Sequence, residues 1–190
     1  RGEVLSDIQL IPVTLLTGFL GSGKTTVLNH ILQCAEFSGA AVIVNEFGDV
    51  GLDHQLVMTS SDNVVLLESG CLCCALRGDL LETLRDLAMR QDAGEFAFDR
   101  VVIETTGLAD PAPILHTLLT NRFLASRFVT DGLVATVDCV TGPETLSQHE
   151  DARRQVAMAD MILMTKSDLP DARVTAVLET LSVLNPGAEV

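Results

Sequence analysis

One short segment of this chain has the residue types and the spacing needed to hold a phosphate group. Residues 18–25 read G-F-L-G-S-G-K-T and fit the pattern G-x-x-x-x-G-K-[ST] between an expected strand and an expected helix. Gly18, Gly21 and Gly23 allow the backbone to curl closely around phosphate oxygens. The following helix offers free N–H groups and the positive end of its dipole. The segment predicts a nucleotide-binding loop, in preference to a glycine turn with a chance Lys-Thr pair.

The polar side chains of this loop have separate expected roles. Lys24 is predicted to reach the β- and γ-phosphates, and the hydroxyl of Thr25 is predicted to ligate Mg²⁺. Thr26 is expected to support the α-phosphate, and Ser22 completes the residues expected to contact the nucleotide.

A carboxylate stands at the end of another expected strand. Residues 100–104 end in Glu104, and ligands in open α/β sheets bind at the carboxyl ends of the strands. Glu104 is therefore predicted to hold Mg²⁺ directly or through water, and the N–H of Gly107 is predicted to meet the γ-phosphate. A solvated acid at a strand end is the less favoured interpretation. Lys24, Glu104 and Gly107 are the predicted catalytic residues.

Residues 165–168 read T-K-S-D, which is similar to the guanine-reading pattern N-K-x-D. The Asp168 carboxylate can accept hydrogen bonds from N1–H and the N2 amino group of guanine, whereas adenine has neither donor there. The stem of Lys166 can lie against the base. These residues favour GTP over ATP, although Thr165 cannot reproduce the asparagine amide and is expected to soften the discrimination.

Three cysteines stand close together, at Cys71, Cys73 and Cys74. Three thiolates can turn toward one soft cation such as Zn²⁺, Co²⁺ or Cu⁺, and a site with only three ligands is open or transferable. A redox thiol pair and three buried cysteines are the competing interpretations. The cluster favours metal binding, with Zn²⁺ preferred over Co²⁺ in equal supply.

The remaining cysteines and most histidines are predicted to have ordinary roles. Cys34 and Cys139 are expected to be small core residues. His30 and His116 fall in expected helices and are taken as solvated or packed, and His149 is taken as a helix cap.

Residues 45–53 form a polar, glycine-bearing segment after the second expected strand, a position typical of a switch loop. Glu46, Asp49 and Asp53 are expected to face Mg²⁺, a second metal or water. His54 is a weak candidate for a fourth ligand beside the cysteines.

Apolar β-branched runs alternate with segments of helical period along the chain, and near-continuous apolar runs are typical of parallel strands buried on both faces. The pattern predicts an α/β fold of the P-loop NTPase class, with a mostly parallel sheet and helices on both faces. The expected strands are residues 11–17, 40–45, 64–67, 100–104, 132–138 and 161–165, and the expected helices are residues 24–34, 79–90, 112–119, 150–159 and 172–184.

The composition limits the class of partner. The chain has 190 residues, which suits one domain, and 12 basic against 26 acidic residues give a net charge of −14. This balance argues against nucleic-acid and membrane surfaces, and no apolar run reaches the roughly 18 residues of a membrane helix. The crowded cysteines favour a reduced, cytoplasmic setting. The turn-like residues 185–190 predict that a second domain follows residues 1–190.

Taken in order, these segments resemble the GTPase domain of the CobW-like metallochaperone GTPases, which include the YjiA-type proteins. The likeness spans roughly residues 11–168 and rests on the segments at residues 18–26, 45–48, 70–74, 104–111 and 165–168. The C-x-C-C block between a phosphate loop and an E-x-x-G strand end is the most specific of these features.

The resemblance implies a GTPase that binds a transition metal at Cys71, Cys73 and Cys74 and uses its nucleotide state to gate metal delivery to a client metalloprotein or to an enzyme of a metal-cofactor pathway. It implies slow hydrolysis, with an arginine supplied by a partner or by the second copy in a homodimer. The family's C-terminal domain is absent from residues 1–190, and Val44 stands where some relatives carry an acid. The alternatives are a P-loop ATPase or kinase with a structural or redox cysteine loop, and a metal-binding module with a vestigial nucleotide site.

Overall fold

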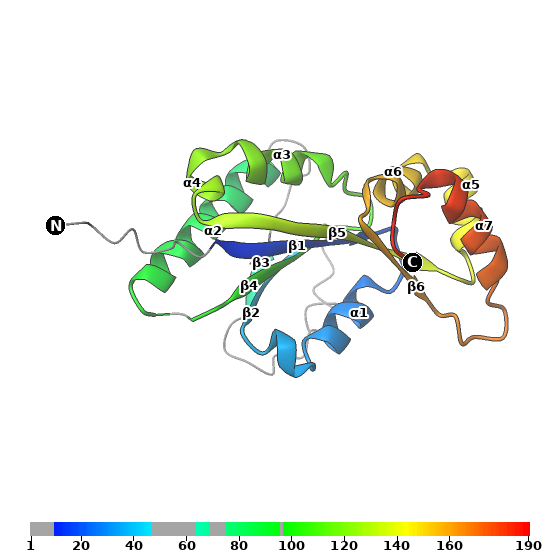
Figure 1. The fold of residues 1–190 in the computed structure, drawn as a ribbon, viewed down its shortest axis with the longest axis horizontal. Helices are drawn as coiled ribbons and strands as arrows, with labels where there is room; N and C mark the ends of the chain where they lie inside the picture. The colour runs from blue at the N-terminus through cyan, green and yellow to red at the C-terminus, as the bar shows by residue number, and fades with distance from the viewer. Residues whose placement is uncertain (1–9, 47–63, 69–74, 96) are drawn as a thin grey trace.

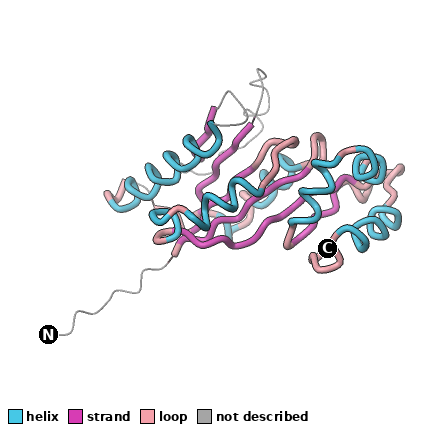
Figure 2. The backbone as a smooth tube through the Cα atoms, turned by 90° about the horizontal axis from the view of Figure 1, so that it is seen from above, coloured by secondary structure: helices cyan, strands magenta, loops and turns pink. Residues whose placement is uncertain are grey.

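The computed structural model describes residues 10–46, 64–68, 75–95 and 97–190. Its described strands form one six-stranded sheet in the order β3-β2-β4-β1-β5-β6, and every neighbouring pair is parallel. Figures 1 and 2 show the sheet as a single layer with helices packed beside it. The strands are β1 (Ile11–Gly18), β2 (Ala40–Glu46), β3 (Val64–Glu68), β4 (Arg100–Glu104), β5 (Phe128–Asp138) and β6 (Met161–Thr165). The predicted α/β fold is confirmed.

Helices cover both faces of the sheet. In Figure 1, α2, α3 and α4 lie on one face, α1 lies on the other, and α5, α6 and α7 gather beside β6. The helices are α1 (Lys24–Ile31), α2 (Ala75–Asp92), α3 (Ala112–Thr120), α4 (Arg122–Ala125), α5 (Gly142–Gln148), α6 (Glu150–Met158) and α7 (Val174–Leu184), with a short 3₁₀ helix at Ala35–Phe37.

The alternation of side chains along each strand divides the core between the two faces. In β2, Ala41 and Ile43 pack toward α2, whereas Val42 and Val44 pack toward Leu28 of α1. Because both faces are covered, the strands carry apolar residues at successive positions, which is the pattern seen in the sequence. A third cluster fills the space between β5, β6 and helices α5–α7.

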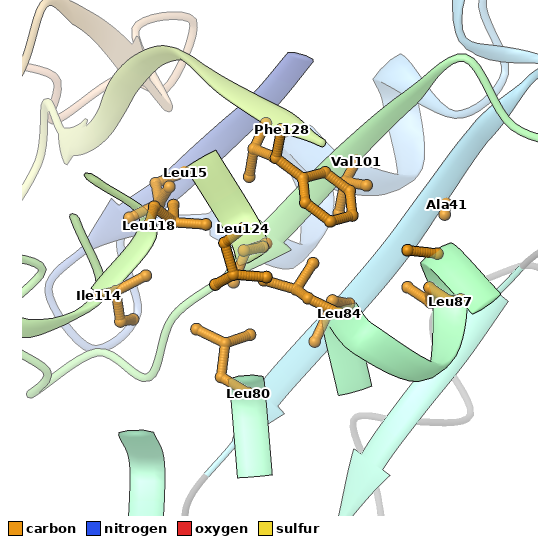
Figure 3. Close-up of a cluster of buried hydrophobic side chains, with 14 of the residues drawn as sticks. Leu15, Ala41, Leu80, Leu84, Leu87, Val101, Ile114, Leu118, Leu124 and Phe128 are labelled. Carbon is orange, nitrogen blue, oxygen red and sulfur yellow. The ribbon is translucent and has the colours of Figure 1, made fainter. Parts of the chain in front are cut away.

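One apolar stripe of α2 packs into the first of these clusters. Leu80, Leu84 and Leu87 are buried and face Leu124 and Phe128 (Figure 3). Their spacing of three or four residues brings them to one side of the helix, as the sequence predicts.

The observed elements differ from the predicted ones in several places: α1 ends at Ile31 rather than at residue 34, α2 begins at Ala75 rather than at residue 79, and neither α4 nor the 3₁₀ helix was predicted. β5 begins at Phe128 rather than at residue 132, because a bulge opposite Val13 and Leu15 accommodates Gly132, whose φ is +109°. Helix α5 was not predicted, because its opening Gly-Pro pair is typical of a turn, although proline also suits the first turn of a helix. No described helix is long and apolar enough to span a bilayer.

Candidate nucleotide-binding site

The loop between β1 and α1 has the backbone shape that only glycines adopt without strain. Gly18, Gly21 and Gly23 have φ values of +144°, +72° and +90°. A Cβ on Gly18 would lie 2.1 Å from Oγ1 of Thr136, so this glycine is also required by close packing. Gly23 stands immediately before the first residue of α1, and the free N–H groups of that helix therefore face the loop.

Lys24 curls back over this loop. Its Nζ donates to the carbonyl of Gly18 at 2.8 Å and to that of Phe19 at 3.3 Å. The ammonium group is thus held at the mouth of the loop, where an anion bound by the α1 N-terminus would meet it.

Thr25, in the first turn of α1, contacts Glu104, the last residue of β4. The Thr25 hydroxyl donates to Oε1 of Glu104 at 3.1 Å, and the Glu104 side chain is only 1% exposed. A hydroxyl oxygen and a carboxylate oxygen are ligands of the kind that Mg²⁺ accepts. The donor set therefore fits this ion, and the structure brings together the two residues predicted to hold it.

Gly107 lies against the phosphate loop. A Cβ on Gly107 would be 2.6 Å from Cδ2 and 2.7 Å from the backbone nitrogen of Leu20, so no larger residue fits there. The loop that follows β4 therefore touches the loop that follows β1, which is the proximity predicted for a group that senses the γ-phosphate.

A buried layer of hydroxyls supports the loop from behind. Ser22 Oγ and Thr136 Oγ1 are 2.6 Å apart, and Thr105 donates to Thr17 Oγ1 at 3.0 Å. Ser22 was predicted as a nucleotide contact, whereas its Oγ is buried against Thr136 of β5. The signal available in the sequence was a set of threonines at positions where a buried strand normally carries aliphatic residues.

The T-K-S-D segment is joined to the phosphate loop by two hydrogen bonds. The Thr165 hydroxyl donates to the carbonyl of Ser22 at 2.7 Å, and Lys166 Nζ donates to the carbonyl of Gly21 at 3.0 Å. Lys166 adopts a left-handed φ of +55°, and Asp168 is exposed.

Asp138 is a site residue that the sequence analysis missed. It lies buried at the end of β5 and accepts from Lys166 Nζ at 2.5 Å and from the backbone N–H groups of Val140 and Thr141. Burial alone would raise its pKa, but the bonds from Lys166 and the two backbone groups bring the pKa below its usual value. Its signal was an acid at the carboxyl end of a strand, the same signal that identified Glu104.

His149 does not act as the predicted helix cap. It occupies the position before α6, but its side chain makes no capping hydrogen bond. Its ring stacks on Phe19 of the phosphate loop, with ring centroids 4.5 Å apart.

Cys139 is a core residue, as predicted. It is fully buried, and burial together with the nearby charge of Asp138 raises the pKa of its thiol. Cys34 is half-buried near the end of α1. His30 and His116 are exposed on helices, in agreement with their prediction as solvated residues.

The predicted metal ligands Cys71, Cys73 and Cys74 lie outside the described residues, as do Asp49, Asp53 and His54. Glu46 ends β2 and is paired in the backbone register with Glu68, the last residue of β3. Within the described ranges, no cluster of three or more His, Cys, Asp or Glu side chains could hold a metal ion.

A parallel α/β sheet with a glycine-rich phosphate loop, a following helix and a threonine–glutamate pair defines a P-loop nucleotide-binding domain. Residues 12–190 match the model of the CobW/HypB/UreG nucleotide-binding domain, and the chain belongs to this family. The resemblance noted in the sequence is confirmed.

Relatives with curated names agree with this assignment. The chain is 44% identical over 180 residues to the zinc chaperone YjiA of Escherichia coli, covering 95% of this chain and 56% of that protein. It is 34% identical over 193 residues to the zinc-regulated GTPase metalloprotein activator 1 of Schizosaccharomyces pombe, covering 97% of this chain and 46% of that protein. The chain thus spans about half the length of these relatives.

A solved structure also matches the described fold. The Zn(II)-bound YjiA GTPase from E. coli is 40% identical with a TM-score of 0.69, over 91% of this chain and 54% of that one. This structural match supports the fold assignment independently of the sequence motifs.

Proposed function

We propose that this chain binds and hydrolyses GTP and couples its nucleotide state to the transfer of a transition metal, with zinc as the cargo. The part of this proposal that concerns GTP rests on one observation, the contact between Thr25 and Glu104 beside the phosphate loop. It provides two oxygen atoms of the kind that Mg²⁺ accepts, and these two residues would hold the ion beside the phosphates.

In this proposal the phosphate loop and α1 hold the phosphates, with Lys24 neutralising their charge. Contacts from Gly21, Ser22, Gly23 and Thr26 complete the cradle. Mg²⁺, when bound between Thr25 and Glu104, supplies charge neutralisation at the β- and γ-phosphates. The backbone N–H of Gly107 donates to the γ-phosphate. When hydrolysis removes this phosphate, the hydrogen bond is lost and the loop that carries Gly107 is released.

Guanine is the base that the chain selects. Asp168 accepts from N1–H and the N2 amino group, and Lys166 lies along the base while remaining tied to Gly21 and Asp138. The exposure of Asp168 leaves it open to a ligand that arrives from solvent.

The metal is held by Cys71, Cys73 and Cys74. The names of the relatives support zinc as the cargo, since they are a zinc chaperone and a zinc-regulated GTPase. β2 lies between β3, which leads toward the cysteines, and β4, which carries Glu104.

The recipient of the metal is a client metalloprotein or an enzyme of a metal-cofactor pathway, and the setting is the cytoplasm. A second copy of the chain or a partner supplies the arginine that would accelerate hydrolysis. A further domain after residue 190 would contribute the contacts with the client.

The deciding experiment measures Zn²⁺ affinity by competition with a chromophoric chelator, in the presence of GTP·Mg²⁺ or GDP·Mg²⁺. We expect different affinities with the two nucleotides, and by reciprocity Zn²⁺ shifts nucleotide affinity by the same factor. Cys71→Ser, Cys73→Ser and Cys74→Ser should abolish the difference.

Three outcomes would contradict the proposal. Equal Zn²⁺ affinity with either nucleotide would show that the metal site and the nucleotide site are not coupled. Turnover of ATP in preference to GTP would instead identify a P-loop ATPase or kinase. Lys24→Ala should lose GTP turnover. Equal turnover in Lys24→Ala and wild type would show that the phosphate loop takes no part in hydrolysis.

A further inference from the structure

Beyond the residues already assigned, one buried side chain holds the loop that follows β4. We propose that Gln155 of α6 is a positioning residue for GTP hydrolysis, which fixes the backbone around Gly107 so that its N–H stays aimed at the γ-phosphate. This inference rests on the proposed GTPase function and adds to it a residue that never contacts the nucleotide.

The buried amide of Gln155 makes two hydrogen bonds to the loop that follows β4. Its Nε2 donates to the carbonyl of Gly107 at 3.1 Å and to the carbonyl of Ala109 at 3.0 Å. Two acceptors converge on one nitrogen, so the orientation of the amide is determined. The side chain is 1% exposed, and among the described residues its Oε1 has no hydrogen-bond partner. A buried glutamine with an unmet acceptor costs stability, which points to a role outside folding.

Gly107 is held between two structures that do not belong to its own loop. On one side Leu20 of the phosphate loop stands within 2.9 Å of where a Cβ would lie, and on the other side Gln155 binds its carbonyl. Gln155 thus holds the peptide that follows Gly107 and the peptide that follows Ala109, and so limits rotation of the backbone immediately after the Gly107 N–H.

Helix α6 provides a fixed base for this contact. Asn185 Nδ2 donates to the carbonyls of Val156 at 2.9 Å and Ala159 at 2.8 Å, which secures the end of the helix. Ala152 and Val156 pack into the core between β5, β6 and α7. Because the helix is fixed in this way, the Gln155 side chain can hold the loop after β4 in one position.

The test compares Gln155→Met, which keeps the volume and removes the donor, with Leu87→Ala, a core change on α2 in a different cluster from the one that contains Ala152 and Val156. We expect Gln155→Met to lower kcat for GTP by about 10- to 100-fold, the scale of a misplaced group. Its KM for GTP and its affinity for GDP should stay close to wild type, because the phosphate loop itself is intact. Leu87→Ala should lower the melting temperature while retaining kcat.

A spectroscopic readout follows the loop directly. The chain contains no Trp, so Leu108→Trp places a single indole at an exposed position beside Gly107. In this background, a non-hydrolysable GTP analogue with Mg²⁺ should change the fluorescence, and Gln155→Met should reduce that change and lower the anisotropy of the indole.

The outcomes separate the inference from the function on which it rests. Absence of GTP turnover in the wild type would overturn the proposed GTPase. If the wild type is active, equal kcat in Gln155→Met, or an equal loss in Leu87→Ala, would overturn the positioning role of Gln155 and leave the GTPase in place.

Discussion

The hydroxyl of Thr165 lies 2.7 Å from the carbonyl of Ser22, so the strand that leads to the T-K-S-D segment is bonded directly to the phosphate loop. Thr165 stands where the related pattern has asparagine. The structure explains how the chain retains a tether at this position with a shorter side chain, because Thr165 packs beside Gly23.

Thr165→Val tests this tether. The variant keeps the shape of the side chain and leaves the Ser22 carbonyl without its donor, so we expect GDP affinity to fall about fivefold. Isothermal titration calorimetry measures the effect. Thr165→Ser retains the hydroxyl and should bind like wild type, and an unchanged affinity in Thr165→Val would show that the tether contributes nothing to binding.

Gly107→Ala is expected to damage hydrolysis more than binding. The added Cβ would approach the backbone nitrogen of Leu20 to 2.7 Å and push the two loops apart. We expect kcat for GTP to fall by at least about tenfold, with smaller changes in GDP affinity. Gly187→Ala is the matched control, because the nearest atom to its Cβ would be at an ordinary 3.8 Å. Equal kcat in the two variants would contradict the contact.

Asp168→Asn should change the preferred base. An asparagine amide pairs poorly with the two donors of guanine but offers a donor to the carbonyl that xanthine carries in place of the amino group. We expect GTP turnover at low substrate to fall and xanthosine triphosphate turnover to appear. Asp171→Asn, a nearby exposed acid, should retain the GTP preference. A retained preference in Asp168→Asn would place base recognition elsewhere.

Asp138 predicts a specific acid sensitivity. Its pKa in the folded protein lies below its ordinary value of 3.8, so its stabilising contribution is complete above about pH 4 and is lost as the pH falls through the lowered folded value. The melting temperature of wild type should therefore fall more steeply below pH 4 than that of Asp138→Asn. Asp131→Asn, an exposed acid on the same strand, should follow wild type. Parallel curves for Asp138→Asn and wild type would contradict this assignment.

The sequence identified those features whose cause is local. The six strands were predicted because parallel strands buried on both faces carry continuous apolar runs, and the phosphate loop was predicted because its glycines and lysine are adjacent in the chain. Gln155 was missed because its role depends on a partner 48 residues away along the chain, which no spacing rule reveals. Asp138 carried the strand-end signal that identified Glu104, but its pairing with Lys166, 28 residues away, is not visible in the sequence. The turn-like opening of α5 concealed a helix for a different reason, since Gly-Pro suits both structures.

The place of β3 at the end of the strand order has a consequence for hydrogen exchange. Within the described sheet, β3 is held by a single ladder to β2, whereas β1 and β4 are each held on both sides. Edge elements open locally at a lower free energy than central ones, so the amides of Val64–Glu68 should exchange with solvent before those of the interior strands. Since the three cysteines follow this strand along the chain, a metal bound to them as proposed would slow that exchange, and the protection of a few backbone amides would then report the metal-loaded fraction of the protein.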